Sequence, residues 1–250
     1  NIFSSNPNIN QITVRDNYGP VICVCGNYNE QITHTWGGDQ GEIGGSHSDI
    51  QELHIDNITV TENKKLMDYV HVYYKNAIGI DISYAGRMKL TNSIITNNEG
   101  PGIEMGVSNA ILSNLIISGN GFNSYGSANR YGGGISIGTI PEITSVPILT
   151  NIVIENNHAP FGGGLSVGGP AILNNLTIVN NISYYSAGPA IHGASYEQIY
   201  KNVTIYGNFS ELTGSNPHQV LAYCEEGYGS PTFINSIIWD DTIAPFSISS

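Results

Sequence analysis

The chain has 250 residues, with 8 Lys and Arg against 20 Asp and Glu, so its formal net charge is −12. Charged residues make up 11% of the chain and hydrophobic residues 40%, which is too apolar for a disordered protein. The acidic balance argues against a nucleic-acid or anionic-membrane partner. No run approaches the roughly 18 apolar residues that a membrane-spanning helix requires.

A nine-residue motif, apolar-x-Asn-x-x-(Ile/Val)-x-x-Asn, recurs along the chain. Seven copies begin at residues 55, 90, 112, 149, 173, 200 and 233, the last with Asp at its final position, and residues 9–17 form an eighth with Gln11 in the first Asn position. We call the first asparagine of each copy the anchor; the anchors are Asn57, Asn92, Asn114, Asn151, Asn175, Asn202 and Asn235. Neighbouring anchors lie 22 to 37 residues apart, which is typical of a solenoid with one repeat per turn.

A second strand signal, led by glycine, follows each motif copy at a variable distance. Such signals occur at 79–82, 102–105, 134–137 and 164–167, and more loosely at 188–191. Helical periodicity is absent, and the frequent Gly and Asn disfavour helices. A leucine-rich repeat would need its own Leu frame, and a propeller blade would need a longer, more regular period.

These patterns predict an all-β fold: a parallel β-helix solenoid of about eight or more coils, stacked about 4.8 Å apart, with variable loops on one edge. We expect one aliphatic column inside, formed by Val60, Ile95, Ile117, Ile154, Ile178, Ile205 and Ile238. We expect the anchors to form an inward asparagine ladder at a turn, where their amides satisfy backbone groups and bond to the neighbouring coils.

Residues 1–250 are expected to form a single domain, a fragment of a longer secreted or surface protein. The stretch 28–51 breaks the repeat, and it is either an inserted loop or a degenerate coil. We also expect Ile94, Ile116 and Val153 to point outward on three consecutive coils, as an apolar strip that the 139–148 insertion covers.

Several segments resemble those of known β-helix proteins. Residues 162–167 (Gly-Gly-Gly-Leu-Ser-Val) and 152–157 (Ile-Val-Ile-Glu-Asn-Asn) resemble the GGAI and FxxN elements of polymorphic outer-membrane proteins. Residues 234–239 resemble a late-coil motif of large secreted bacterial β-helix proteins. Over residues 9–241 the chain resembles the right-handed parallel β-helix repeat proteins of the pectate-lyase-like superfamily. The resemblance implies the fold and an extracellular or cell-surface location, but this scaffold carries lyases, hydrolases, adhesins and stalks.

Family members that cleave acidic polysaccharides are expected to combine carboxylates that hold Ca²⁺ with an Arg or Lys base. The eight basic residues here form no Arg-x-x-Arg group, and the polygalacturonase-like signatures Asn-Thr-Asp, Gly-His-Gly and Arg-Ile-Lys are missing. The histidines show no HxH or HxxxH spacing, so zinc is not expected. No residue is therefore assigned a catalytic role, and no cofactor is expected.

One column of the glycine-led strands could bind a metal ion. Their middle residues, Asp81, Glu104, Ser136 and Ser166, should point outward. Asp81 and Glu104 would lie about 5 Å apart on adjacent coils, close enough to share a proton or to hold a cation such as Ca²⁺. The alternative is two solvated carboxylates, which we favour because nothing basic or histidyl completes a site.

The variable loops before the glycine-led strands should project from one edge, where repeat proteins often bind their ligands. These loops are rich in aromatic residues, and the candidate binding residues are Tyr73, Tyr74, Tyr125, Arg130, Tyr131, Phe161, Tyr184 and Tyr185. The rings could stack on sugar faces, or they could fold back over the edge of the core. Their exposure distinguishes the two alternatives.

We therefore expect a non-catalytic stalk or adhesin-type module of an extracellular protein. It would bind glycan through its Tyr-rich loop edge or contact another surface protein. The alternative is a polysaccharide lyase or glycoside hydrolase that acts on an acidic or plant-type polysaccharide.

Overall fold

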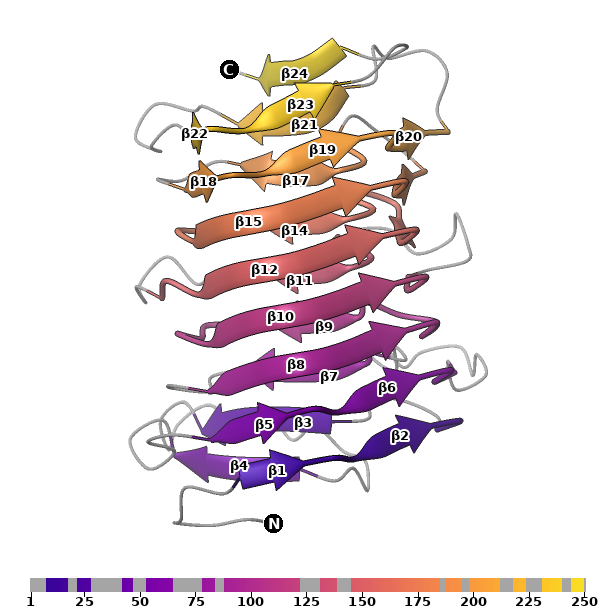
Figure 1. Cartoon of the computed structure of the whole chain (residues 1–250), viewed down its shortest axis with the longest axis vertical. Coiled ribbons are helices and arrows are strands. Elements are labelled where there is room, and N and C mark those ends of the chain that lie inside the picture. Colours follow the sequence, from indigo (N-terminus) through magenta and orange to yellow (C-terminus); the bar gives the residue numbers. More distant parts are fainter. Residues whose placement is uncertain are drawn as a thin grey trace.

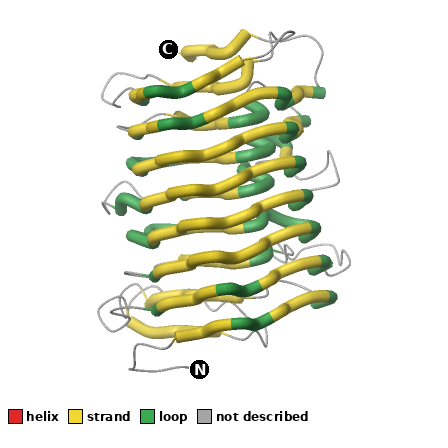
Figure 2. The backbone as a smooth tube through the Cα atoms, viewed as in Figure 1, coloured by secondary structure: helices red, strands yellow, loops and turns green. Residues whose placement is uncertain are grey.

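The computed structural model describes residues 8–17, 22–27, 42–46, 53–64, 78–83, 88–121, 131–138, 145–184, 188–194, 198–211, 218–223, 231–239 and 244–249. These residues form strands, turns and loops, and none of them is helical (Figure 2). The described part of the chain is therefore all-β, as the sequence predicts.

The larger of two main sheets has twelve strands. They are β1 Asn8–Asn10, β2 Thr13–Arg15, β5 His54–Asp56, β6 Thr59–Thr61, β8 Lys89–Thr96, β10 Ile111–Ser118, β12 Ile148–Glu155, β15 Ile172–Val179, β18 Ile199–Lys201, β19 Thr204–Tyr206, β22 Thr232–Ile234 and β23 Ile237–Trp239. They pair in parallel with the strands of the neighbouring motif copies, and within the described residues the first and last copies pair on one side only.

The smaller main sheet has nine parallel strands, in the order β24 Ala244–Ser249, β21 His218–Tyr223, β17 Ile191–Ala194, β14 Leu165–Val167, β11 Ile135–Ile137, β9 Ile103–Met105, β7 Ile80–Ser83, β3 Ile22–Asn27 and β4 Glu42–Ser46. A third, three-stranded sheet joins β13 His158–Ala159, β16 Ile182–Ser183 and β20 Phe209–Ser210.

The chain alternates between the two main sheets, so that β8 leads to β9, β10 to β11 and β12 to β14. Figure 1 shows these passes lying one above the next from the N-terminal to the C-terminal end. We call one pass through the larger sheet, together with the following strand of the smaller sheet, a layer. Since each layer repeats the motif, equivalent residues of successive layers form columns.

Every anchor asparagine has a positive φ angle, between 50° and 57°. Asn tolerates this left-handed conformation better than most residues do. In β8 the anchor is Asn92. Residues on both sides of it pair with the neighbouring strands, but Asn92 itself is skipped in the pairing registers. The left-handed residue bends the strand, so Leu90 and Ser93 both face inward although three positions separate them.

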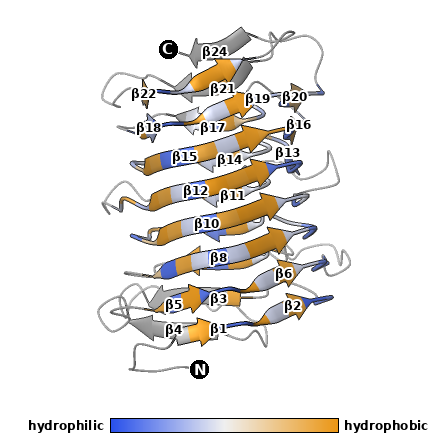
Figure 3. Cartoon of the chain, in the orientation of Figure 1, coloured by the Kyte–Doolittle hydropathy of each residue, from blue (hydrophilic) through white to orange (hydrophobic). Residues whose placement is uncertain are grey.

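The predicted aliphatic column is confirmed. Residues 60, 95, 117, 154, 178 and 205 are fully buried and in register, and Ile238 is half-buried in the last layer. The long strands β8, β10, β12 and β15 are correspondingly mostly hydrophobic in Figure 3. A second inward column runs through Leu90, Leu112, Leu149 and Leu173 and ends at Tyr200 and Phe233, whose rings stack 4.5 Å apart.

The predicted position of the asparagine ladder is wrong. The anchors do bond to one another: Asn114 donates to Asn92, Asn151 to Asn114, and Asn175 to Asn151, at 2.8 to 3.1 Å. However, they are exposed on the outer face of the larger sheet. The left-handed bend points the anchor away from the core, so the expected burial of its amide does not occur.

The last asparagine of each motif forms the buried ladder instead. Its members are Asn63, Asn98, Asn120, Asn157, Asn181 and Asn208, each at most 2% exposed. The backbone N–H and Nδ2 of Asn120 donate to Oδ1 of Asn157, and Asn157 donates in the same way to Asn181. The second Nδ2 hydrogen of Asn157 goes to the carbonyl oxygen of Ile117. Each interior amide thus satisfies both its own polar atoms and two backbone groups.

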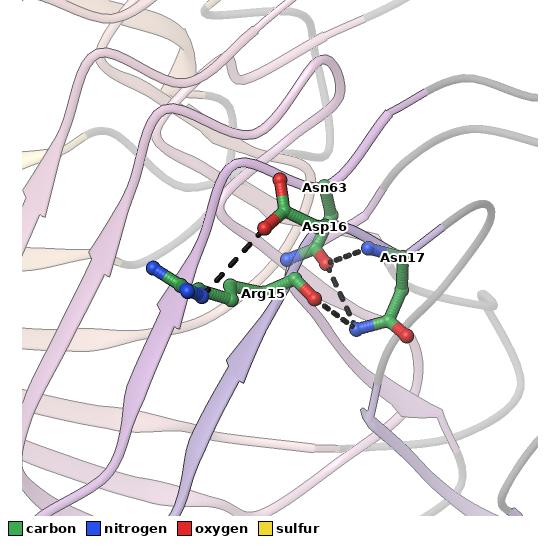
Figure 4. Close-up of polar contacts among 4 residues, drawn as sticks. All are labelled: Arg15, Asp16, Asn17 and Asn63. Carbon is green, nitrogen blue, oxygen red and sulfur yellow. Dashed lines mark hydrogen bonds and ion pairs between the residues drawn. The ribbon is translucent and has the colours of Figure 1, made fainter.

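At the N-terminal layer the ladder reaches the surface at Asn17 (Figure 4). The backbone N–H and Nδ2 of Asn17 both donate to Oδ1 of Asn63, at 3.1 and 3.3 Å. Its neighbours Arg15 and Asp16 form an exposed ion pair at 3.6 Å. The same ladder geometry therefore begins in water and continues into the core.

The glycines that lead the strands of the smaller sheet pack against this ladder. A Cβ atom on Gly102 would lie 2.8 Å from Cγ2 of Ile117 and 2.9 Å from Nδ2 of Asn120. Gly134 meets Ile154 and Asn157 in the same way. Gly132, two residues before Gly134, has a positive φ angle of 69°, whereas the strand-leading glycines are required because the backbone approaches its neighbours closely.

Part of the irregular stretch 28–51 is a strand. β4 pairs in parallel with β3 on the side away from β7 and forms the N-terminal edge of the smaller sheet. The rest of this stretch lies outside the described residues.

The predicted apolar strip is only partly covered. Ile94 and Ile116 are 41% and 43% exposed, so nothing buries them, whereas Val153 is half-buried. Residues 139–144 lie outside the described part, so their contact with Val153 stays a prediction.

Candidate functional site

Five of the ten residues that the sequence singles out can be placed: Tyr131, Phe161, Tyr184, Asp81 and Glu104. The other five lie outside the described residues; they are Tyr73, Tyr74, Tyr125, Arg130 and Tyr185. The placed residues lie mainly on the outer face of the smaller sheet and in the loops that precede its strands.

A row of polar side chains crosses this face, one from each of five consecutive strands. The pairing registers place Asp81 beside Glu104, then Ser136, Ser166 and His192. The expected adjacency of Asp81 and Glu104 in the sheet is therefore confirmed. Adjacent members lie about 4.8 Å apart, the usual spacing of strands.

His192 also belongs to this row, although the sequence pattern did not predict its place there. The sequence pattern predicts that Gly188 is equivalent to the glycines that lead the other strands, but the structure pairs Ile191 with Leu165 and His192 with Ser166. Ala190 thus occupies the glycine position. Alignment on the apolar residue after the glycine, rather than on the glycine, would have found His192.

Three rings gather at the His192 end of the row. Tyr131 and Phe161, which precede β11 and β14, stack with ring centroids 5.1 Å apart and an interplanar angle of 28°. The His192 ring lies 5.1 Å from that of Tyr131 and 5.4 Å from that of Phe161. Tyr131 is 38% exposed and His192 only 7%. The rings therefore cover His192, and Tyr131 also presents a surface to solvent.

Tyr184 lies elsewhere. Its ring is edge-on to His158 of the three-stranded sheet, with centroids 6.0 Å apart. The structure thus brings Tyr131 and Phe161 together, and places Tyr184 in a second aromatic contact.

Burial controls the protonation of this surface. It lowers the pKa of His192 to about 4, so the imidazole is neutral at pH 7. Burial also raises the pKa of Asp81 above its ordinary value, although a hydrogen bond from the Ser83 hydroxyl at 2.5 Å acts in the opposite direction. Within the described residues, no group of three or more His, Cys, Asp and Glu side chains is arranged to hold a metal ion.

A strip without side chains runs beside the polar row. The next outward position on these strands is Ser83 in β7 and then a glycine in each of the next three layers, namely Gly106, Gly138 and Gly168. Their N–H groups donate to the preceding layer, for example Gly138 to Met105 at 2.7 Å. Among the described residues, a Cβ atom on Gly138 would come within 4 Å of the Met105 carbonyl oxygen alone, at 3.6 Å. We call Gly106, Gly138 and Gly168 the glycine strip.

No family model, curated protein or solved structure matches this chain. Within the part of the chain that the structure describes, no helix is long and apolar enough to cross a membrane. The function must therefore be inferred from the surface itself.

Proposed function

We propose that this chain is a right-handed parallel β-helix solenoid of the pectate-lyase-like kind, and a non-catalytic, glycan-binding module of an extracellular or cell-surface protein. The uniform parallel pairing of the strands supports the fold. So does the core, in which the inward side chains of each layer pack against those of the neighbouring layers. A stalk or adhesin-type role is consistent with such a one-dimensional stack.

The exposed ring of Tyr131 carries the proposal for glycan binding. Phe161 supports its inner side, so the ring is held in place and its binding costs little side-chain entropy. Hydroxyl and carboxylate groups of the polar row lie on the same face, where they could pair with sugar hydroxyls. Aromatic stacking beside hydrogen-bonding groups is the arrangement that sugars require, because they have apolar faces and polar edges.

A glycan array with the intact chain tests the proposal, followed by titration of each bound glycan by isothermal calorimetry. Replacing Tyr131 with Ala should weaken binding at least about tenfold, the equivalent of 1.4 kcal/mol. Tyr206→Ala is the matched control, because Tyr206 is a similarly exposed tyrosine on the larger sheet. The absence of any bound glycan, or equal losses in both variants, would contradict the proposal.

The adjacent carboxyl groups of Asp81 and Glu104 favour one alternative, a polysaccharide-cleaving enzyme. Retaining glycosidases hold two carboxyl groups about 5–5.5 Å apart, and the strand spacing is similar. The raised pKa of Asp81 suits a general acid. Release of reducing ends or of unsaturated products from pectin, alginate or xylan would establish this alternative, provided that Glu104→Gln abolishes it.

A further inference from the structure

We propose that two copies of this chain associate through a patch of aromatic and aliphatic side chains at the C-terminal end of the larger sheet. The patch consists of the outward side chains of Tyr206, Ile234, Ile237 and Trp239, and we call it the aromatic patch. It belongs to the larger sheet, whereas the glycan site proposed above belongs to the smaller one. The inference therefore does not depend on the proposed glycan binding.

Strand pairing brings the members of the aromatic patch together. Tyr206 of β19 pairs in register with Trp239 of β23, so their side chains leave the same face about 4.8 Å apart. Ile237 lies two positions before Trp239 and therefore faces the same way. Ile234 follows on the other side of the anchor Asn235. Figure 1 shows β19 and β23 side by side near the C-terminal end.

The patch is large enough to form the centre of an interface. All four side chains are exposed, Ile237 at 63% and Trp239 at 58%. Since an aromatic side chain covers about 150–250 Å² when it is buried, the four together present roughly 400 Å² of mainly apolar surface. Patches of this size on soluble proteins often mark interaction sites. With neighbours such as Thr204 as a rim, two copies would bury about 600 Å² each, which is at the lower end of specific interfaces.

The repeat itself does not require aromatic rings at these positions. The column that ends at Tyr206 and Trp239 contains no ring in the earlier described layers, where its members are Arg15, Thr61, Thr96, Ser118, Glu155 and Val179. Strand propensity would favour aromatic residues equally in every layer. The two rings are instead adjacent, where they can take part in a single contact.

A second copy of the chain is the partner that this composition fits. Two-fold packing places the same surface on both partners, so the surface must be complementary to itself. Tyr, Trp and Ile side chains meet this condition, because rings stack offset or edge-to-face and need no opposite charge. Trp and Tyr are also frequent at the centres of interfaces. The area and the composition of the patch thus both suit a weak two-fold dimer.

Sedimentation velocity of the intact chain from about 1 to 300 µM tests the association, because this range covers the dissociation of an interface of this size. We expect a concentration-dependent dimer. Ile237→Glu should weaken it at least about tenfold, because two like charges would meet in an apolar contact. Ile94→Glu is the matched control, since Ile94 is an exposed isoleucine of the same column in an earlier layer, and it should associate like the wild type. Circular dichroism checks that both variants fold.

Fluorescence tests whether the patch itself forms the contact. The chain has two tryptophans, Trp36 and Trp239, so a Trp36→Phe variant reports on Trp239 alone. Its emission should move to shorter wavelength over the concentrations at which sedimentation detects the dimer, because Trp239 then leaves water.

Three results would overturn the proposal: a monomer at every concentration, equal weakening by Ile237→Glu and Ile94→Glu, or a dimer in which the Trp239 emission stays constant. The salt dependence gives a further test. Each copy has a formal net charge of −12, so added salt should screen the repulsion and strengthen the association. A dimer that salt weakens would be held by ion pairs, and this result would also contradict an apolar interface.

Discussion

The two asparagine columns of this protein contain the same residue in successive layers, yet their surroundings differ. The anchor column is exposed, and its amides bond mainly to one another along the outer face of the larger sheet. The last-asparagine column is buried, and its amides bond both to one another and to backbone N–H and C=O groups. Water can replace the first set of bonds when they are lost, but it cannot reach the second. The comparison shows that burial, more than the bond between amides, determines what an asparagine ladder contributes.

The largest effect should follow from Asn157→Ala. This change removes the acceptor of two Asn120 donors and the donor to Ile117 and Asn181, all in the core. Buried groups left unpaired cost about 1–3 kcal/mol each, so the free energy of unfolding should fall by at least about 3 kcal/mol. Urea denaturation measures this loss, and a fall below about 1 kcal/mol would show that the buried ladder is not a main source of stability.

The same contrast between a buried and a solvated polar group predicts a pH dependence from His192. Its folded pKa is about 4, whereas the unfolded chain has the ordinary value of 6.5. Between these values the unfolded state binds more protons, so this group should make stability rise with pH from about 4 to 6.5, by up to roughly 3 kcal/mol. Below about pH 4 its contribution no longer changes.

The difference between wild type and His192→Phe, measured by denaturation at several pH values, isolates this contribution. The comparison is needed because the raised pKa of Asp81 acts in the opposite direction: its protonated form is favoured by folding, so its contribution to stability falls as pH rises through its folded pKa. A wild-type profile parallel to that of His192→Phe between pH 4 and 6.5 would contradict the burial of a neutral imidazole.

A smaller loss should follow from Gly102→Ala, which places a methyl group against the buried column. The added Cβ would lie within 3 Å of Ile117, of Asn120 and of the Gly134 carbonyl oxygen. Overpacking of this kind costs about 1–3 kcal/mol. Gly138→Ala is the control, since the new methyl group would lie no closer than 3.6 Å to any atom of the described residues, and thermal melts of the two variants should differ clearly. Equal melting temperatures would argue against tight packing at Gly102.

The smallest effect should come from the exposed column. Asn151→Ala loses exposed hydrogen bonds and places Ala at a φ angle of 56°, so we expect a cost of about 1 kcal/mol. Asn151→Gly loses the same bonds but adopts this conformation without strain, and it should cost less. If Asn151→Ala destabilises the protein as much as Asn157→Ala does, the distinction between the two columns is wrong.

Much of the architecture was predictable because it repeats. The spacing of the motif indicated parallel strands. The two-residue periodicity of a strand then predicted that residues such as Ile95 and Ile117 face the interior. The same rule placed Asp81 beside Glu104. The rule failed at the anchors, because one residue with positive φ interrupts the alternation of the strand and reverses the direction that the next residues face. It also missed His192, because an alanine replaces the glycine that was used for alignment.

The sequence by itself determined the repeat, the all-β character and the columns of aliphatic residues, since hydrophobic periodicity is a local property that each copy displays independently. The tertiary structure alone decided which asparagine is buried, because this depends on which side of the bend meets the glycine-led strand from the opposite sheet. It alone also brought Tyr131, Phe161 and His192 together, from three separate layers. Contacts between layers join residues about 30 positions apart in the sequence. A local sequence pattern therefore cannot predict which loop residues of different layers come into contact.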